Sequence, residues 1–199
     1  MNENSFISSL NQFAETYRSN LLMMMNNVDW ADVEALGNEL LSCYHDGRRV
    51  LICGNGGSGA NAIHMANDFL YGINKKLGGG LRCKALTANS SVITCLANDE
   101  EYSEIFAYQI ATEGDPHDLL LVLSGSGNSP NILRAIEEAN SRGMTTFGIL
   151  GFDGGQAKSL VHQHIHVPID DMQISEDFQM IFAHIISQWM FSMLGDPSL

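Results

Sequence analysis

The sequence predicts an α/β protein: a three-layer sandwich in which helices cover both faces of a central, mainly parallel, five-stranded sheet. Two observations lead to this prediction. Short apolar runs typical of buried strands alternate with longer stretches of helical periodicity, as in parallel sheets. Two loops rich in glycine and serine, residues 53–58 and 124–129, each stand between such a run and a helical stretch. Because parallel strands end at one edge of their sheet, we expect both loops to meet there.

The N-terminal part is predicted to form a pair of helices. Apolar residues recur at three- and four-residue steps over residues 4–26, beginning at Phe6, and Asn27 and Asp29 interrupt the pattern. A second helix is expected from about Trp30 to Tyr44, with Gly47 just after its end. This pair, residues 1–46, has more apolar surface than one small sheet can cover, and we expect it to contribute to an oligomer interface.

The remaining elements are predicted to alternate along the chain. No linker or low-complexity segment interrupts them, so residues 1–199 are expected to form a single domain. The glycine-rich segment 72–80 is expected to be a mobile loop. Strands are predicted at 48–53, 81–86, 119–123, 145–150 and 164–167, and helices at about 59–71, 90–97, 103–112, 131–141, shortly after 155, and 174–193.

Composition excludes several classes of protein. The net charge is −13, and the chain has only ten lysines and arginines, which argues against a direct nucleic-acid partner. No signal peptide is recognisable and no stretch approaches the roughly 20 apolar residues that cross a bilayer, so we expect a cytoplasmic protein without a membrane partner. The four cysteines, at positions 43, 53, 83 and 95, lack zinc-knuckle or disulfide spacing and are expected to be buried free thiols.

The two loops predict a phosphate site. Glycine lets the backbone approach a ligand, and serine hydroxyls together with helix N-terminal amides can hold an anion. With so few basic residues, this chain has to bind an anion mainly through such uncharged donors. Two loops at one sheet edge therefore suggest one phosphorylated ligand held from two sides.

The same motifs resemble those of the SIS (sugar isomerase) domain family, which comprises phosphosugar isomerases and phosphosugar-binding regulators with a flavodoxin-like fold. Within this family the chain is similar over nearly its whole length to the bacterial phosphoheptose isomerases. The motifs that carry the resemblance are CGNGGS at 53–58 followed six residues later by His64, Ala97-Asn98-Asp99, SGSGNS at 124–129, Gly154-Gly155, and His184 in the last helix.

The resemblance implies an activity and an assembly. The expected reaction converts sedoheptulose 7-phosphate to D-glycero-D-manno-heptose 7-phosphate by aldose–ketose isomerisation through an enediol. The expected protein is a homotetramer with active sites between subunits, one zinc ion per subunit and no organic cofactor. Such a reaction needs a base at the carbon, an acid at the oxygen and a firm hold on the phosphate.

The resemblance also assigns these roles to residues. Asp68 and His184 are the expected catalytic pair. The phosphate is expected at Ser124, Gly125, Ser126 and Ser129, and the sugar and the near side of the anion at Asn55, Gly56, Gly57, Asn98, Asp99 and Glu176. Ser58 is left with two interpretations, a ligand contact or the N-cap of its helix.

A candidate metal site combines two pairs of residues. His64 and Asp68 are four residues apart and share a helix face, as metal ligands, as an acid–base pair or as a plain surface pair. Glu176 and His184 lie eight apart on broadly one side of the last helix. Together the four could coordinate zinc or another divalent ion. The family has glutamate at position 68 and usually glutamine at 176, so this chain departs from it twice.

Two alternatives to the heptose isomerase remain. One is a non-catalytic phosphosugar-binding SIS protein, of the type that associates with a replication initiator and lacks the catalytic pair. The other is an isomerase of a different sugar phosphate, which the departures at Asp68 and Glu176 would suit. The two loops cannot distinguish these functions, whereas the presence of Asp68 and His184 favours an enzyme.

Overall fold

The centre of the molecule is a five-stranded, wholly parallel sheet with the strand order β2-β1-β3-β4-β5. The structure, a computed structural model, describes residues 9–74 and 79–195. The order reverses between β1 and β3, which makes the gap between their carboxyl ends the topological switch point where such sheets bind ligands. The strands are β1 (Arg49–Gly54), β2 (Arg82–Ala85), β3 (Leu119–Ser124), β4 (Thr145–Leu150) and β5 (Gln163–His166).

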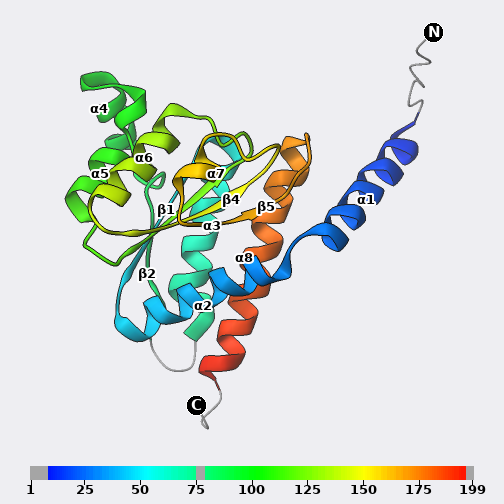
Figure 1. Ribbon diagram of the computed structural model, residues 1–199, viewed down its shortest axis with the longest axis horizontal. Coiled ribbons are helices and arrows are strands. Elements are labelled where there is room, and N and C mark those ends of the chain that lie inside the picture. The colour runs from blue at the N-terminus through cyan, green and yellow to red at the C-terminus, as the bar shows by residue number, and fades with distance from the viewer. Residues whose placement is uncertain (1–8, 75–78, 196–199) are drawn as a thin grey trace.

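Helices cover both faces of the sheet, as predicted (Figure 1). Alternate strand residues point to opposite faces, so Val50 and Ile52 belong to one apolar core whereas Leu51 and Cys53 belong to the other. The first core is closed by α2 (Trp30–Asp46), α3 (Gly56–Tyr71) and α8 (Met172–Leu194), and the second by α4 (Ser90–Asp99), α5 (Ala107–Glu113), α6 (Pro130–Ser141) and α7 (Ala157–Leu160). A short 3₁₀ turn, η2 (Tyr102–Glu104), connects α4 to α5.

Two predicted segments differ from the structure. The helix expected over 103–112 is divided into η2 and α5, because Ile105 and Phe106 turn into the second core. The expected loop at 72–80 begins instead with a 3₁₀ turn, η1 (Gly72–Asn74), which places Ile73 in the first core; residues 75–78 lie outside the described residues. The predicted helix start at residue 4, with Phe6, also lies outside them.

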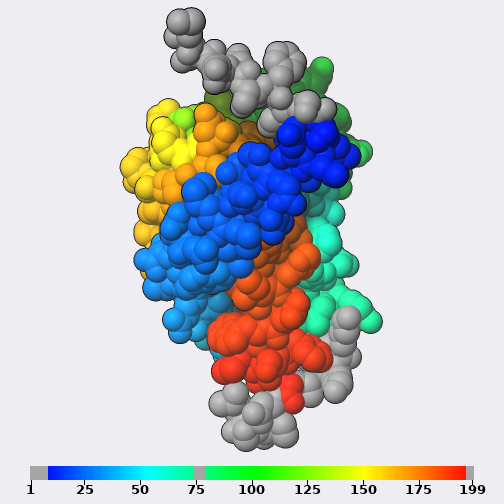
Figure 2. Space-filling model, turned by 90° about the vertical axis from the view of Figure 1, so that its right-hand side faces the viewer, coloured from blue at the N-terminus to red at the C-terminus, as the bar shows by residue number. Residues whose placement is uncertain are grey.

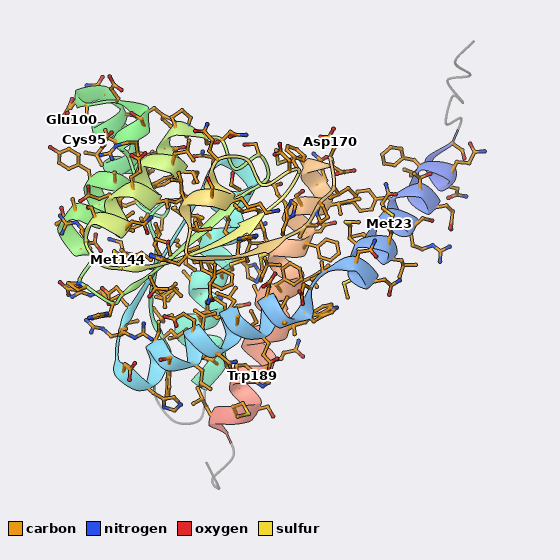
Figure 3. All side chains as sticks on the ribbon, viewed as in Figure 1. Met23, Cys95, Glu100, Met144, Asp170 and Trp189 are labelled. Carbon is orange, nitrogen blue, oxygen red and sulfur yellow. The ribbon has the colours of Figure 1, made fainter. Side chains whose placement is uncertain are left out.

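The prediction that all four cysteines are buried is wrong for one of them. Cys43, Cys53 and Cys83 are buried free thiols, whereas Cys95 is exposed. It stands on α4, an outer helix without a single buried residue, near Glu100 (Figure 3). Burial raises the pKa of Cys43 to about 12 and raises the pKa of Cys53 further, so these thiols stay protonated at neutral pH.

The first helix, α1 (Leu10–Asn27), extends beyond the body of the molecule (Figure 1). The middle of the helix lies over α8 (Figure 2), where the Tyr17 hydroxyl donates a hydrogen bond of 2.6 Å to the Asp177 carboxylate. Its N-terminal half leaves Leu10 82% exposed and Phe13 54% exposed. Over residues 9–74 and 79–195, none of the helices has the length and apolar character needed to span a bilayer.

Candidate active site

The two glycine-serine loops face each other across one cavity, as the sequence predicts. The first loop leads from β1 into α3 and the second leads from β3 to α6, so both lie at the switch point of the sheet. The first two turns of α8 complete the wall. The cavity has a volume of about 250 Å³ and is lined by Asn55, Gly56, Gly57, Ser58, Leu123, Ser124, Gly125, Ser126, Ser129, Met172 and Glu176.

The second loop presents hydroxyl groups whose protons are available to a ligand. The Ser124 hydroxyl oxygen accepts a hydrogen bond from the Gly127 amide at 3.0 Å, and that of Ser126 accepts from the Asn128 amide at 3.3 Å. Because each oxygen acts as an acceptor within the loop, its own proton can be donated outward. The turn requires glycine at position 127, where φ is +63° and a Cβ would overlap the Gly154 carbonyl.

The helices that follow the loops have N-termini without a side-chain cap. The cap residues of α1, α2, α4 and α8 each accept a hydrogen bond from their own first turn. Asn55 and Ser129, the cap residues of α3 and α6, accept none. Their first-turn amides are therefore not satisfied by a cap side chain and can point at a bound anion.

A reciprocal pair of amides joins the two loops, and sequence reasoning missed it. The Asn55 side chain donates to Asn131 at 2.8 Å, and Asn131 donates back to Asn55 at 2.7 Å. Asn131 is only 1% exposed. A sugar that contacts Asn55, as expected, would therefore have to share the carboxamide that already holds α3 against α6. The available signal was the position of Asn131, directly after the second loop.

A buried polar seam continues from the cavity between α3 and α8. Ser58, the third residue of α3, donates to the Glu176 carboxylate at 3.3 Å and accepts from the Gln179 amide at 3.0 Å. Asn61 in turn donates to the Gln179 side-chain oxygen at 2.9 Å. The interpretation of Ser58 as an N-cap is wrong, because Asn55 holds that position. Gln179, 1% exposed, is a second residue that sequence reasoning missed.

Farther along the same two helices, His64, Asp68 and His184 form a cluster within one chain. The His64 Nε2 lies 3.3 Å from an Asp68 carboxylate oxygen and 3.3 Å from the His184 Nε2, which is itself 3.6 Å from that oxygen. One ligand atom from each residue lies within 4.8 Å of the others. Two imidazoles and a carboxylate at such separations fit a divalent cation such as zinc.

Comparison with known proteins identifies the family of the chain. A sequence profile of the SIS domain matches residues 12–151. The chain belongs to the SIS domain family. A phosphoheptose isomerase of Clostridium acetobutylicum is 36% identical over 156 residues, 77% of this chain and 78% of that protein. One from Burkholderia pseudomallei is 33% identical over 178 residues, 88% of this chain and 89% of that protein.

Solved structures show the same fold. The structure of a phosphoheptose isomerase from Francisella tularensis superimposes with a TM-score of 0.86 at 28% identity, covering 92% of this chain and 96% of that one. A phosphoheptose isomerase from Neisseria gonorrhoeae, with a TM-score of 0.84 at 24% identity, shows the same fold over 92% of this chain and 100% of that one. The five-stranded parallel order is thus the SIS architecture that the sequence predicts.

In this SIS domain, the structure keeps three expected site residues apart from their predicted neighbours. Glu176 lines the loop cavity and is not part of the histidine cluster, since eight residues of α8 correspond to about 12 Å along the helix axis. Asn98 and Asp99 end α4, on the other face of the sheet from α8, and neither lines the cavity. The Asn98 amide and the Cys95 thiol lower the pKa of the Asp99 carboxyl by hydrogen bonding to it.

Proposed function

We propose that this SIS protein is an aldose–ketose isomerase that converts sedoheptulose 7-phosphate to D-glycero-D-manno-heptose 7-phosphate. The observation that carries the proposal is the pairing of two features on the same two helices. An anion cavity lies at the start of α3 and α8, and a His–Asp–His cluster lies farther along them. The similar proteins named phosphoheptose isomerase support the heptose substrate.

In this proposal the phosphate lies in the loop cavity. The hydroxyls of Ser124, Ser126 and Ser129 and the first-turn amides of α3 and α6 hold it. Gly56, beside which the structure leaves open space, lets the phosphate approach the backbone of the first loop. All of these donors are uncharged, which explains how a chain with a net charge of −13 can bind a phosphorylated sugar.

In this proposal the sugar chain then runs from the cavity over α3 and α8 toward the His64–Asp68–His184 cluster. Gly57 and His64 are seven residues apart, about 10 Å along the helix, and side chains of a helix lean back toward its N-terminus. An extended seven-carbon chain anchored by its phosphate can therefore bring its carbonyl end toward the cluster. There Asp68 takes the proton from the carbon next to the carbonyl, and His184 exchanges a proton with the oxygen.

A divalent metal ion, zinc in the first instance, is proposed as the cofactor. His64, Asp68 and His184 would hold it, and a bound ion would polarise the carbonyl oxygen of the sugar. Metal analysis of the purified protein tests this directly. We expect about one ion per chain, lost from His64→Ala and His184→Ala but retained by Ser126→Ala, which alters only the cavity.

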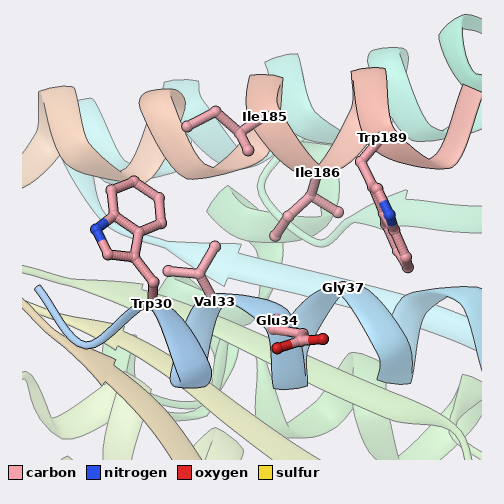
Figure 4. Close-up of a pocket in the computed structure, with 7 residues that line it drawn as sticks. All are labelled: Trp30, Val33, Glu34, Gly37, Ile185, Ile186 and Trp189. Atoms are coloured by element: carbon pink, nitrogen blue, oxygen red, sulfur yellow. The ribbon is translucent and has the colours of Figure 1, made fainter. Parts of the chain in front are cut away.

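A homotetramer is the proposed assembly, in the cytoplasm. The N-terminal half of α1 exposes Leu10 and Phe13, which need a partner surface to be covered. An apolar groove also lies between α2 and α8, where Trp30 and Trp189 flank Gly37 (Figure 4). Sedimentation or light scattering of the full chain gives the subunit number.

The direct test is a turnover assay with sedoheptulose 7-phosphate, with and without added zinc. Formation of an aldoheptose phosphate supports the proposal. Tight binding of the sugar phosphate without turnover in either condition would instead favour a non-catalytic SIS protein. If the protein turned over only a different ketose or aldose phosphate, it would be an isomerase with another substrate.

A further inference from the structure

Glu176 is the one ionisable residue among those that line the loop cavity in the described part of the chain. Its carboxylate packs against the backbone of Gly57, where a Cβ would overlap both carboxylate oxygens. A carboxylate therefore stands beside the first turn of α3, inside a cavity whose other polar groups are hydroxyls, amides and the Asn55 carboxamide. It is a negative charge in a site proposed to bind a phosphate.

In the described part of the chain, Glu176 has no cationic side chain as a partner. Among the described residues, none of the ion pairs includes Glu176, and its carboxylate accepts one hydrogen bond, from Ser58 at 3.3 Å. Such a carboxylate only accepts hydrogen bonds. It consequently repels a phosphate dianion, and it attracts a group that can donate, such as a sugar hydroxyl.

We propose that Glu176 is a specificity-determining residue that makes the loop cavity select phosphorylated polyols over inorganic phosphate. Either ligand meets the same serine hydroxyls and the same repulsion from the carboxylate. Only the polyol phosphate has hydroxyls that can donate hydrogen bonds to Glu176. These bonds offset part of the free energy that the repulsion costs. The inference rests on the proposed phosphosugar function, and it gives the cavity a means of rejecting the free anion.

The test compares two ligands in binding, without turnover. Isothermal calorimetry at pH 8 measures the affinity of inorganic phosphate and of sorbitol 6-phosphate for the full-length protein after treatment with a chelator. The variant is Glu176→Gln, which keeps the shape and removes the charge. The matched control is Asp177→Asn, which removes the same charge one residue farther along α8, where the side chain bonds Tyr17 on the outside.

Removing one partly screened charge from the cavity should tighten the binding of inorganic phosphate by about tenfold. The affinity for sorbitol 6-phosphate should rise less, because the variant no longer offers its hydroxyls the Glu176 carboxylate as an acceptor. The ratio of the two affinities, which favours the polyol phosphate in the wild-type protein, should therefore become smaller. Asp177→Asn should change neither affinity by more than about twofold. Glu176→Ala should raise the affinity for inorganic phosphate in the same way. This second variant keeps the test decisive if Glu176→Gln does not fold.

Two results would overturn the inference: weaker or unchanged binding of inorganic phosphate to Glu176→Gln and Glu176→Ala, or an unchanged ratio between the two ligands. Absence of isomerase activity in the wild-type protein would contradict the proposed function instead. Because the binding measurement needs no turnover, the two failures are distinguishable.

Discussion

The loop cavity and the histidine cluster lie along the same pair of helices but hold their polar groups differently. In the cavity the donors are uncharged and packed into the fold; Ser124 is 6% exposed, and Asn131, which braces the loops, is 1% exposed. In the cluster the groups are titratable, and the side chains of His64 and His184 are 53% and 48% exposed. In the proposed function this difference separates binding from chemistry: the packed cavity would hold the phosphate, and the exposed cluster would exchange protons.

The largest expected effect comes from the cluster. Asp68→Asn and His184→Ala should each lower kcat by about a hundredfold or more, because each removes a group proposed to transfer a proton. Neither should change the affinity for inorganic phosphate by more than about twofold, since the cavity is untouched. Steady-state kinetics and calorimetry on the same preparations check both halves of this prediction.

If Asp68→Asn lowered the affinity for phosphate as strongly as it lowered kcat, binding and chemistry would not be carried by separate groups. Asp46→Asn offers a control for the loss of charge. That carboxylate lies at the end of α2, where it pairs with Arg48.

A smaller, complementary effect is expected from the second loop. Ser126→Ala removes one hydroxyl donor to the phosphate, which should raise KM by about tenfold and leave kcat nearly unchanged. Ser141→Ala, which removes an exposed hydroxyl at the end of α6, should leave both constants unchanged. A fall in kcat at constant KM for Ser126→Ala would mean that the loop takes part in the chemistry.

The smallest effect on function is expected at the amide pair between the loops. Asn131→Ala removes both hydrogen bonds between the two carboxamides, leaves Asn55 with the Tyr102 hydroxyl at 3.3 Å, and should lower the free energy of unfolding by about 1–3 kcal/mol. It should also raise KM severalfold, because the loops lose their mutual alignment.

Asn140→Ala is the matched control for this pair. Asn140 also lies on α6, and its side chain makes two hydrogen bonds, to Leu160 and Thr146. We expect a similar loss of stability from Asn140→Ala, measured by denaturant unfolding, without a change in KM. Equal rises of KM in both variants would show that instability alone weakens binding.

Much of the fold was predictable because local patterns determine it. Apolar runs such as Leu119–Leu123 can only be buried strands, and the glycine-serine loops that follow β1 and β3 mark the ligand edge of a parallel sheet. The split between η2 and α5 was not predictable in this way. Helical periodicity continues through Ile105 and Phe106, and only their burial in the second core interrupts the helix.

The candidate site was predictable only in part. His64, Asp68 and His184 come together as proposed, because i,i+4 spacing and a neighbouring helix suffice. The hydrogen bonds of Asn131 and Gln179 join residues 76 and 121 positions apart, so the sequence around each residue does not reveal its partner. Glu176 was grouped with His184 by helix face alone, although the rise along α8 places it in the cavity.

The central claim, that the cluster carries out proton transfer on a sugar held by the loops, is tested most directly in deuterated water. Proton NMR of sedoheptulose 7-phosphate with the wild-type protein should show an aldoheptose phosphate that carries deuterium at the carbon next to its carbonyl. Exchange should be lost in Asp68→Asn and should persist, at higher substrate concentration, in Ser126→Ala. Tight binding of the sugar phosphate by the wild-type protein with neither product nor exchange would contradict the account.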